Sequence, residues 1–207
     1  VCFALTAQAQ KSVTEYFNEG IQRNRNAEYK AAIQSFNKVL ELNPKFIEAY
    51  GNMGNAKFRL GDYKGAKADY DIVLESNPND ALTFYNRATA RKELGDVKGS
   101  IEDNNSAIKI NPKFAEAYFN RGNSYAELGD EKAAMKDYNK AIALTPQFAK
   151  AYYNRGHLRY KGGDVEAAAL DWERAASLDF YKAFDSLKEY CGIGTQETNC
   201  DPTVGLK

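Results

Sequence analysis

Residues 111–131 read NPKFAEAYFNRGNSYAELGDE, and closely similar text recurs as NPKFIEAYGNMGNAKFRLGDY at 43–63 and as TPQFAKAYYNRGHLRYKGGDV at 145–165. The prolines of this repeat stand 34 residues apart, at Pro44, Pro78, Pro112 and Pro146. A fixed period of this length indicates a supersecondary unit that cannot bury its apolar face alone and must stack on its neighbours. The chain is therefore predicted to be a solenoid.

Windows of 34 residues starting at Val13 give five repeats, 13–46, 47–80, 81–114, 115–148 and 149–182. A slot is a numbered position inside this window. Slots 4, 8 and 11, and again slots 20, 24 and 27, have the spacing that places side chains on one face of a helix. Each repeat is therefore predicted to be two helices.

The repeats combine large rings with very small residues. Slot 4 carries an aromatic ring and slot 8 carries glycine or alanine: Gly20, Gly54, Ala88, Gly122 and Gly156. Slot 24 returns a ring in four repeats, Phe36, Tyr70, Tyr138 and Trp172, but holds Asn104 in the middle one. The second helix should press against the small residue of the first, and the middle repeat should pack least well.

Turn residues stand where the predicted helices end. Glycine and aspartate follow the first helix in the pairs at 61–62, 95–96, 129–130 and 163–164, where glycine can adopt the left-handed conformation and aspartate can cap the next helix. The proline near the end of each repeat should stop the second helix, because the residue before proline is pushed out of the helical region.

This pattern of aromatic, small, small, aromatic and proline resembles the tetratricopeptide repeat family over residues 13–182. The resemblance implies an all-α, right-handed superhelical solenoid of five helix-turn-helix repeats. Residues 181–190 are then predicted to be a capping helix, with Tyr181, Phe184, Leu187 and Tyr190 as its apolar edge, followed by a flexible tail at 191–207. Phe180 takes the place of the last repeat's proline.

Slot 7 departs from the family's usual leucine, and holds Glu19, Met53, Arg87, Arg121 and Arg155. Aspartate fills slot 23 in the last four repeats, so the arginines can pair within a repeat or with the preceding one. Pairing between repeats leaves no aspartate opposite Met53. It is the favoured interpretation and joins Asp69 to Arg87, Asp103 to Arg121 and Asp137 to Arg155.

The resemblance implies that the first helices line a concave groove. Slot 6 of this groove is asparagine in every repeat, Asn18, Asn52, Asn86, Asn120 and Asn154, and slot 9 adds Asn55 and Asn123. Rings stand beside them at slot 5, among them Tyr85, Phe119 and Tyr153. A carboxamide both donates and accepts, so it can hold a peptide group without reading its side chain. We therefore expect an extended peptide as ligand. The alternative is that asparagine is a common consensus residue at slot 6 and has no binding role.

Two known grooves of the family help to define the ligand. The asparagine ladder is similar to that in the repeat half of O-GlcNAc transferases, although no transferase domain is present in these 207 residues. The clamp that binds the acidic C-termini of chaperones uses lysine at slot 5, which this chain lacks.

Composition removes several classes of function. The chain has 28 basic and 28 acidic residues, which leaves no overall field to attract nucleic acid. No apolar stretch approaches the ~20 residues that cross a bilayer. No phosphate loop, catalytic serine motif or metal motif is present, and the lone His157 falls on the groove side. A non-enzymatic protein-interaction module without cofactor or metal is predicted; the alternatives are a self-associating scaffold and the substrate-recruiting part of a larger enzyme.

Both ends of the chain favour export. Residues 1–9 are interpreted as the remnant of a signal peptide, because Ala7 and Ala9 form a small-x-small cleavage site before Gln10. In the periplasm or cell envelope, Cys191 and Cys200 are expected to form a disulfide. A disordered N-terminal tail, a cytoplasmic location and two free thiols are the alternatives.

Overall fold

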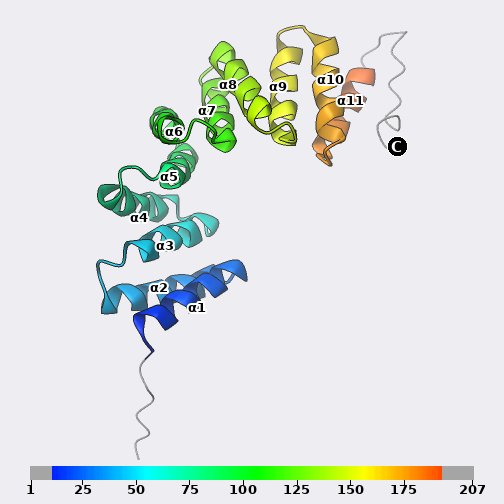
Figure 1. The fold of residues 1–207 in the computed structure, drawn as a ribbon. Helices are drawn as coiled ribbons and strands as arrows, with labels where there is room; N and C mark the ends of the chain where they lie inside the picture. Colours follow the sequence, from blue (N-terminus) through cyan, green and yellow to red (C-terminus); the bar gives the residue numbers. More distant parts are fainter. Residues whose placement is uncertain (1–10, 193–207) are drawn as a thin grey trace, which may run out of the picture. The chain divides into compact units, whose positions relative to one another are not determined.

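The computed structural model describes residues 11–192, and within them it contains eleven helices and no strand. The helices are α1 Val13–Arg25, α2 Tyr29–Leu42, α3 Ile47–Arg59, α4 Tyr63–Ser76, α5 Ala81–Glu93, α6 Val97–Ile110, α7 Ala115–Glu127, α8 Glu131–Leu144, α9 Ala149–Lys161, α10 Val165–Ala176 and α11 Lys182–Gly192. They follow the predicted repeats as consecutive helix pairs plus one added helix (Figure 1). The all-α, helix-turn-helix class is confirmed.

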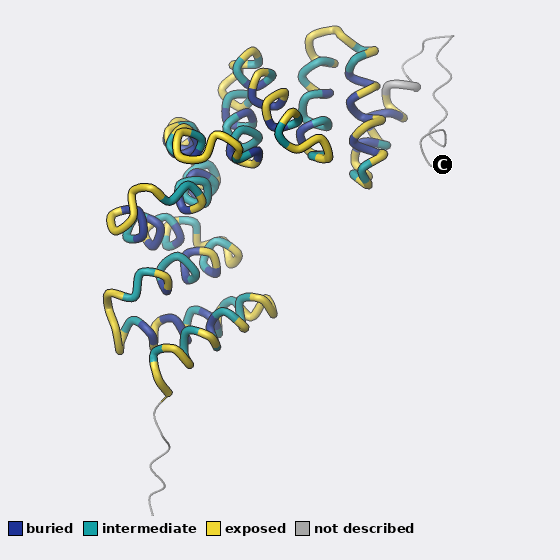
Figure 2. The backbone as a smooth tube through the Cα atoms, viewed as in Figure 1, coloured by how far each residue is buried: buried dark blue, intermediate teal, exposed yellow. Residues whose placement is uncertain are grey.

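The chain divides into two compact units, residues 1–96 and 97–207, and the boundary falls inside the third repeat. The first unit holds α1–α5 and the second holds α6–α11. Within each unit consecutive helices pack on one another, and buried residues lie on the facing sides of the helices while the turns are exposed (Figure 2). The prediction that the middle repeat packs least well stays a prediction.

The core of a repeat forms where the slot 24 ring lies on the slot 8 glycine. A Cβ atom added to Gly54 would lie 2.8 Å from the Tyr70 ring, and one added to Gly122 would lie 2.8 Å from Tyr138. Gly156 has the same relation to the Trp172 indole at 2.6 Å. No side chain fits in these gaps, so the small residue is what allows the two helices to approach.

The predicted turns form as expected. Gly61 and Gly129 adopt φ of +81°, in the left-handed region that glycine tolerates. The aspartate after each of these glycines caps the next helix, because Asp62 Oδ1 accepts from Gly65 N at 2.8 Å and Asp130 Oδ1 accepts from Ala133 N at 3.0 Å. The predicted roles of glycine in closing the first helix and of aspartate in capping the second are thus confirmed.

The first and last repeats end their helices differently. Ala27 closes α1 with φ of +60° where the later repeats use glycine. In the fifth repeat, which lacks the proline, Asp179 takes φ of +62° and Phe180 N donates to Ala175 O at 3.1 Å. As a result α10 has 12 residues, whereas α8 has 14.

The capping helix is α11, and it differs from the prediction in two respects. It runs to Gly192, two residues beyond the expected end, and so includes Cys191 in its backbone. Ala183 and Leu187 are buried against α10, but Tyr181 precedes the helix and is 74% exposed, so it does not belong to the apolar edge. The predicted signal-peptide remnant, Cys200 and the Cys191 side chain lie outside the described residues.

Candidate functional site

Two of the slot 7 arginines, Arg121 and Arg155, pair within their own repeat. Arg121 donates from Nε and Nη2 to the two carboxylate oxygens of Asp137, both at 2.7 Å. Arg155 binds Asp171 in the same two-pronged way, at 2.9 and 2.6 Å. The predicted pairing of Asp103 with Arg121 and Asp137 with Arg155 is therefore wrong. Slot 23 of the second helix faces slot 7 of its own partner helix across the tightly packed pair.

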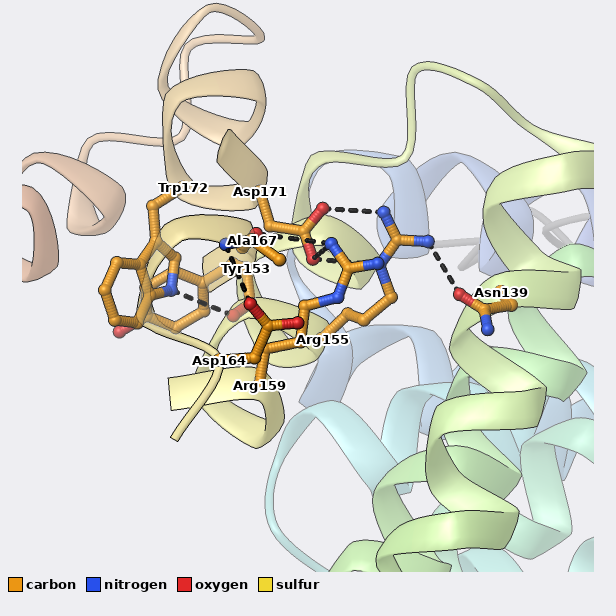
Figure 3. A network of polar contacts seen from close by, with 8 residues as sticks. All are labelled: Asn139, Tyr153, Arg155, Arg159, Asp164, Ala167, Asp171 and Trp172. Carbon is orange, nitrogen blue, oxygen red and sulfur yellow. Dashed lines mark hydrogen bonds and ion pairs between the residues drawn. The ribbon is translucent and has the colours of Figure 1, made fainter. Parts of the chain in front are cut away.

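The connection between repeats is made by a different position, slot 25. Arg121 Nη1 donates to Asn105 Oδ1 at 2.6 Å, and Arg155 Nη1 donates to Asn139 Oδ1 at 2.6 Å. Figure 3 shows Arg155 between Asp171 and Asn139. In the first unit Arg87 bonds Asp71, not the predicted Asp69, at 2.7 Å. One guanidinium thus joins a helix pair and also fixes it to the preceding second helix.

Slot 11 supplies a cation that sequence reasoning missed. Lys57 Nζ lies 2.7 Å from Asp69 Oδ2 in the repeat that has Met53 at slot 7. Burial raises the pKa of Asp69 even though Lys57 opposes this. In the fifth repeat Arg159 Nη1 adds a bond to Asp171 at 3.0 Å. The sequence could have indicated this cation, because slot 11 is basic in four repeats: Arg23, Lys57, Arg91 and Arg159.

On the predicted groove side, the slot 9 asparagines accept hydrogen bonds from the buried tyrosines at slot 24. Tyr70 Oη donates to Asn55 Oδ1 at 2.8 Å, and Tyr138 Oη donates to Asn123 Oδ1 at 2.8 Å. Burial raises the pKa of Tyr138 to about 12, which keeps its hydroxyl protonated as the donor. The first repeat has Phe36 with Ile21 at these two slots, so it has neither the donor nor the acceptor.

The same slot 9 oxygen also receives the slot 6 amide of the next repeat. Asn86 Nδ2 donates to Asn55 Oδ1 at 3.3 Å, and Asn154 Nδ2 donates to Asn123 Oδ1 at 2.7 Å. In each unit, we call the surface formed by slots 6 and 9 of its first helices the amide face. Two of the predicted ligand-binding asparagines are therefore held in place by bonds to the neighbouring repeat.

The remaining asparagines behave differently from these two. Asn52 Nδ2 donates to Glu48 O of its own helix at 2.9 Å, and Asn52 O accepts from Asn24 Nδ2 at 3.1 Å. Asn18 of α1 is exposed, and Asn120 is half-buried. The five slot 6 residues share a position but not one set of partners.

The rings at slot 5 pack against phenylalanines that follow the second helices. Ring centroids lie 4.8 Å apart for Phe17 and Phe46 and 4.9 Å apart for Phe119 and Phe148. Tyr153 contacts Phe180 at 4.9 Å, while Tyr85 is half-buried. These rings help to seat the loop between repeats, so only part of each ring is left to contact a ligand.

Residues 11–192 offer no group of three histidine, cysteine, aspartate or glutamate side chains that could bind a metal ion. None of the helices described in this range is both long and apolar enough to span a bilayer.

Comparison with known proteins places this repeat in a family. A family model described as TPR repeat matches residues 27–61, 89–129 and 122–163, and a second, described as Tetratricopeptide repeat, matches 47–80. The chain belongs to the tetratricopeptide repeat family. Proteins of this family are generally non-enzymatic modules that bind other proteins.

Solved structures with the same fold share little sequence with this chain. MamA from Desulfovibrio magneticus RS-1 is 23% identical, with a TM-score of 0.72, and the match covers 81% of this chain and 94% of MamA. The thermophilic TPR protein TTC0263 of Thermus thermophilus is 20% identical, with a TM-score of 0.67 and coverage of 87% and 98%. YrrB, described as a TPR protein with an unusual peptide-binding site, is 24% identical, with a TM-score of 0.68 and coverage of 86% and 92%. No curated protein matches the sequence.

Proposed function

We propose that this protein is an exported, non-enzymatic binding module that holds an extended segment of a partner protein along its amide face. The observation that carries this proposal is the hydrogen bonding of the Asn86 and Asn154 side chains. Each gives one amide hydrogen to a slot 9 oxygen. These bonds use the Nδ2 atom of each side chain, and the Oδ1 atom is the acceptor that we assign to a peptide N–H.

The hydrogen bonds to Asn55 and Asn123 favour binding because they fix the amides beforehand. A free asparagine side chain loses rotamer freedom when it binds a ligand, and that loss subtracts from affinity. Here the neighbouring repeat has already ordered the amide. Each new hydrogen bond then contributes about 0.5–1.5 kcal/mol net, so several along the face suffice for micromolar binding.

An amide face selects for backbone rather than side chains. Carboxamides can pair with the N–H and C=O groups that every peptide has, which predicts broad sequence tolerance. The described peptide-binding site of YrrB, a protein of the same fold, is consistent with such a use of the fold. Broad tolerance distinguishes this proposal from a module that recognises one short motif.

The test is selection from a library of random dodecapeptides displayed on phage, followed by titration calorimetry of the selected peptides. We expect peptides with varied sequences and dissociation constants near micromolar. N-methylation of a central backbone amide should weaken binding about tenfold, because it removes a donor, whereas replacing a side chain with alanine at most positions should change it less than threefold. Failure to enrich any peptide, or equal tolerance of N-methylation at every position, would refute the proposal.

Export is proposed from the Ala7-Gln8-Ala9 site and from the two cysteines near the C-terminus. Intact mass of protein taken from its native cell should give Gln10 as the first residue and a mass lower by two hydrogens for the Cys191–Cys200 disulfide. Untrimmed protein in which Cys2, Cys191 and Cys200 are all alkylatable would contradict export.

The ends of the described chain do not favour self-association. Exposed polar residues include Glu15 and Gln22 on α1 and Asp185 and Lys188 on α11. Polar outer faces are typical of terminal repeats that cap a solenoid. We therefore place the binding site on the amide face rather than at the ends.

A further inference from the structure

The first helix of the fifth repeat carries three aromatic rings on its groove side. Tyr153, His157 and Tyr160 occupy slots 5, 9 and 12 of α9, which is the i, i+4, i+7 spacing of one helical face. Tyr153 and His157 meet edge to face with centroids 4.4 Å apart. We call these three residues the aromatic stripe. Each of the other four first helices has a non-aromatic residue at slot 9, namely Ile21, Asn55, Thr89 and Asn123.

Trp172 forms a rigid base beneath the stripe. It is 2% exposed, and its ring centroid lies 5.2 Å from His157 and 5.7 Å from Tyr160. Its Nε1 donates to Tyr153 O at 3.3 Å, and Gly156 lets it approach closely. Figure 3 shows Trp172 against Tyr153. The stripe is therefore ordered without a ligand, while His157 is exposed and Tyr160 is 38% exposed.

Charges around the stripe favour a positively charged ligand. Glu189 of α11 is exposed and lies close enough to His157 to act on its pKa. Contact with the Tyr153 and Trp172 rings desolvates one side of the imidazole and lowers the pKa of His157 despite this carboxylate, so the imidazole is neutral at pH 7. Lys161, at the end of α9, is already paired with Glu131. Lys150 is exposed on the same helix, but it stands seven residues from His157, about 10 Å along the axis.

We propose that the aromatic stripe and Glu189 anchor a lysine or arginine side chain of the bound segment. Tyrosine ring faces carry partial negative charge and attract ammonium and guanidinium groups within about 6 Å of the centroid. The Glu189 carboxylate, whose charge acts on the imidazole of the stripe, supplies the opposite formal charge. An apolar or aromatic side chain could use the rings but gains nothing from the carboxylate. This inference rests on the proposed peptide binding and adds a preferred residue to it.

The sequence itself provides the reporters for a test. Trp172 is the only tryptophan and His157 the only histidine of the chain, so indole fluorescence and the imidazole NMR signal report on this site alone. The probe is the capped peptide GSGSKSGSG, compared with the same peptide carrying norleucine or glutamate in place of lysine. We expect the lysine peptide to shift both signals and to bind at least fivefold more tightly than the norleucine peptide. Equal affinity, or no shift with 10 mM lysine peptide, would overturn the inference.

Paired variants separate the site from general effects on folding. Tyr160→Leu and Glu189→Gln should each weaken lysine-peptide binding about fivefold. Their controls are Tyr181→Leu and Glu166→Gln, which remove an exposed tyrosine and an exposed glutamate elsewhere and should leave binding unchanged. If Glu189→Gln has no effect while the controls also bind normally, the anchor is not cationic.

Acid pH provides a further arm of the test. Tyr153 on its own helix and the uncharged indole of Trp172 on α10 contact His157, and Glu189 on α11 is the charged group that acts on its pKa. Protonation of His157 places a positive charge beside the bound cation, so affinity for the lysine peptide should fall below the histidine's pKa. By linkage, the lysine peptide should lower that pKa by the same free energy. His157→Gln should remove the pH dependence; an unchanged profile in this variant would contradict the geometry.

Failure of this inference is distinguishable from failure of the proposed function. If only the anchor is wrong, library peptides still bind and still respond to backbone N-methylation, but show no preference for lysine or arginine. If only the amide face is wrong, the lysine peptide still shifts Trp172 while no long peptide is enriched.

Discussion

Arg121 and Asp137 are joined by two parallel hydrogen bonds of 2.7 Å, and the third nitrogen of the same guanidinium reaches Asn105 of the preceding second helix at 2.6 Å. Asp137 is 2% exposed, and the Arg121 guanidinium also lies 5.5 Å from the Tyr118 ring. The hydrogen bonds to Asp137 raise the pKa of Arg121. Arginine therefore replaces the family's usual leucine at slot 7 as a polar residue whose three side-chain nitrogens each donate a hydrogen bond.

Arg121→Leu should destabilise the protein because it strands the buried Asp137 carboxylate. Removing one partner of a buried pair costs about 3–5 kcal/mol, whereas replacing both by apolar groups can be neutral. We therefore expect a large loss for Arg121→Leu and much of it restored by adding Asp137→Leu. Urea unfolding of the two single variants and the double variant measures this coupling. Additive losses in that cycle would exclude the pair as a unit.

Tyr70 and Asn55 should behave as a replaceable polar pair. Tyr70→Phe removes one hydrogen bond and should cost about 1 kcal/mol. Adding Asn55→Ile recreates the Phe36 and Ile21 combination of the first repeat, so the double variant should be more stable than the sum of the single changes. Thermal melts of the single and double variants test this. A stability loss in the double variant equal to the sum of the two single losses would show that the two positions act independently.

Ala27→Gly should stabilise the first repeat. Ala27 adopts φ of +60°, where an L-residue with a Cβ is strained by roughly 1–2 kcal/mol. Glycine relieves this strain, but part of the relief is offset because glycine has more conformational freedom in the unfolded chain. A net gain of about 0.5–1 kcal/mol is expected. Gly129→Ala, at φ of +81° in the fourth repeat, is the matched reverse change and should lose a comparable amount. Destabilisation by Ala27→Gly would contradict this explanation.

His157 should make stability depend on pH in the mildly acidic range. Partial desolvation by the neighbouring rings lowers its pKa from the ordinary value of 6.5, so the unfolded chain takes up a proton at a higher pH than the folded protein does. Protons then favour unfolding, and the stability present above pH 6.5 is lost as pH falls through the folded pKa. Melting temperatures of the wild type and His157→Gln between pH 7.5 and 5 test this. Parallel curves for the two proteins would contradict it.

The sequence predicts the helix pairs well because their determinants are local or strictly periodic. Gly129 and Asp130 encode a turn, and Gly122 with Tyr138 encodes the close approach of two helices. The ion pairs were mispredicted because the sequence alone allows the slot 23 aspartate to pair with slot 7 of its own repeat or of the next repeat. Their choice depends on side-chain geometry, and the role of Lys57 beside Met53 shows that a second slot can supply the cation.

The candidate site is predicted only in outline. Slot 6 asparagines are visible as a column in the sequence, but their partners depend on what the neighbouring repeat presents at slot 9. Asn154 finds Asn123, while Asn52 turns back to Glu48 O of its own helix. The buried Asn104, whose Oδ1 has no partner among the described residues, likewise follows from a single substitution in the repeat pattern.

The most direct test of the account is the affinity of a selected extended peptide for Asn86→Ala/Asn154→Ala. The matched control is Asn105→Ala/Asn139→Ala. It also removes two asparagine side chains bonded to neighbouring repeats, but these lie on second helices away from the amide face. Both proteins should melt within a few degrees of each other. We predict that titration calorimetry shows at least tenfold weaker binding for the first variant and unchanged binding for the control; equal affinity in the two variants would contradict the amide face as the binding site.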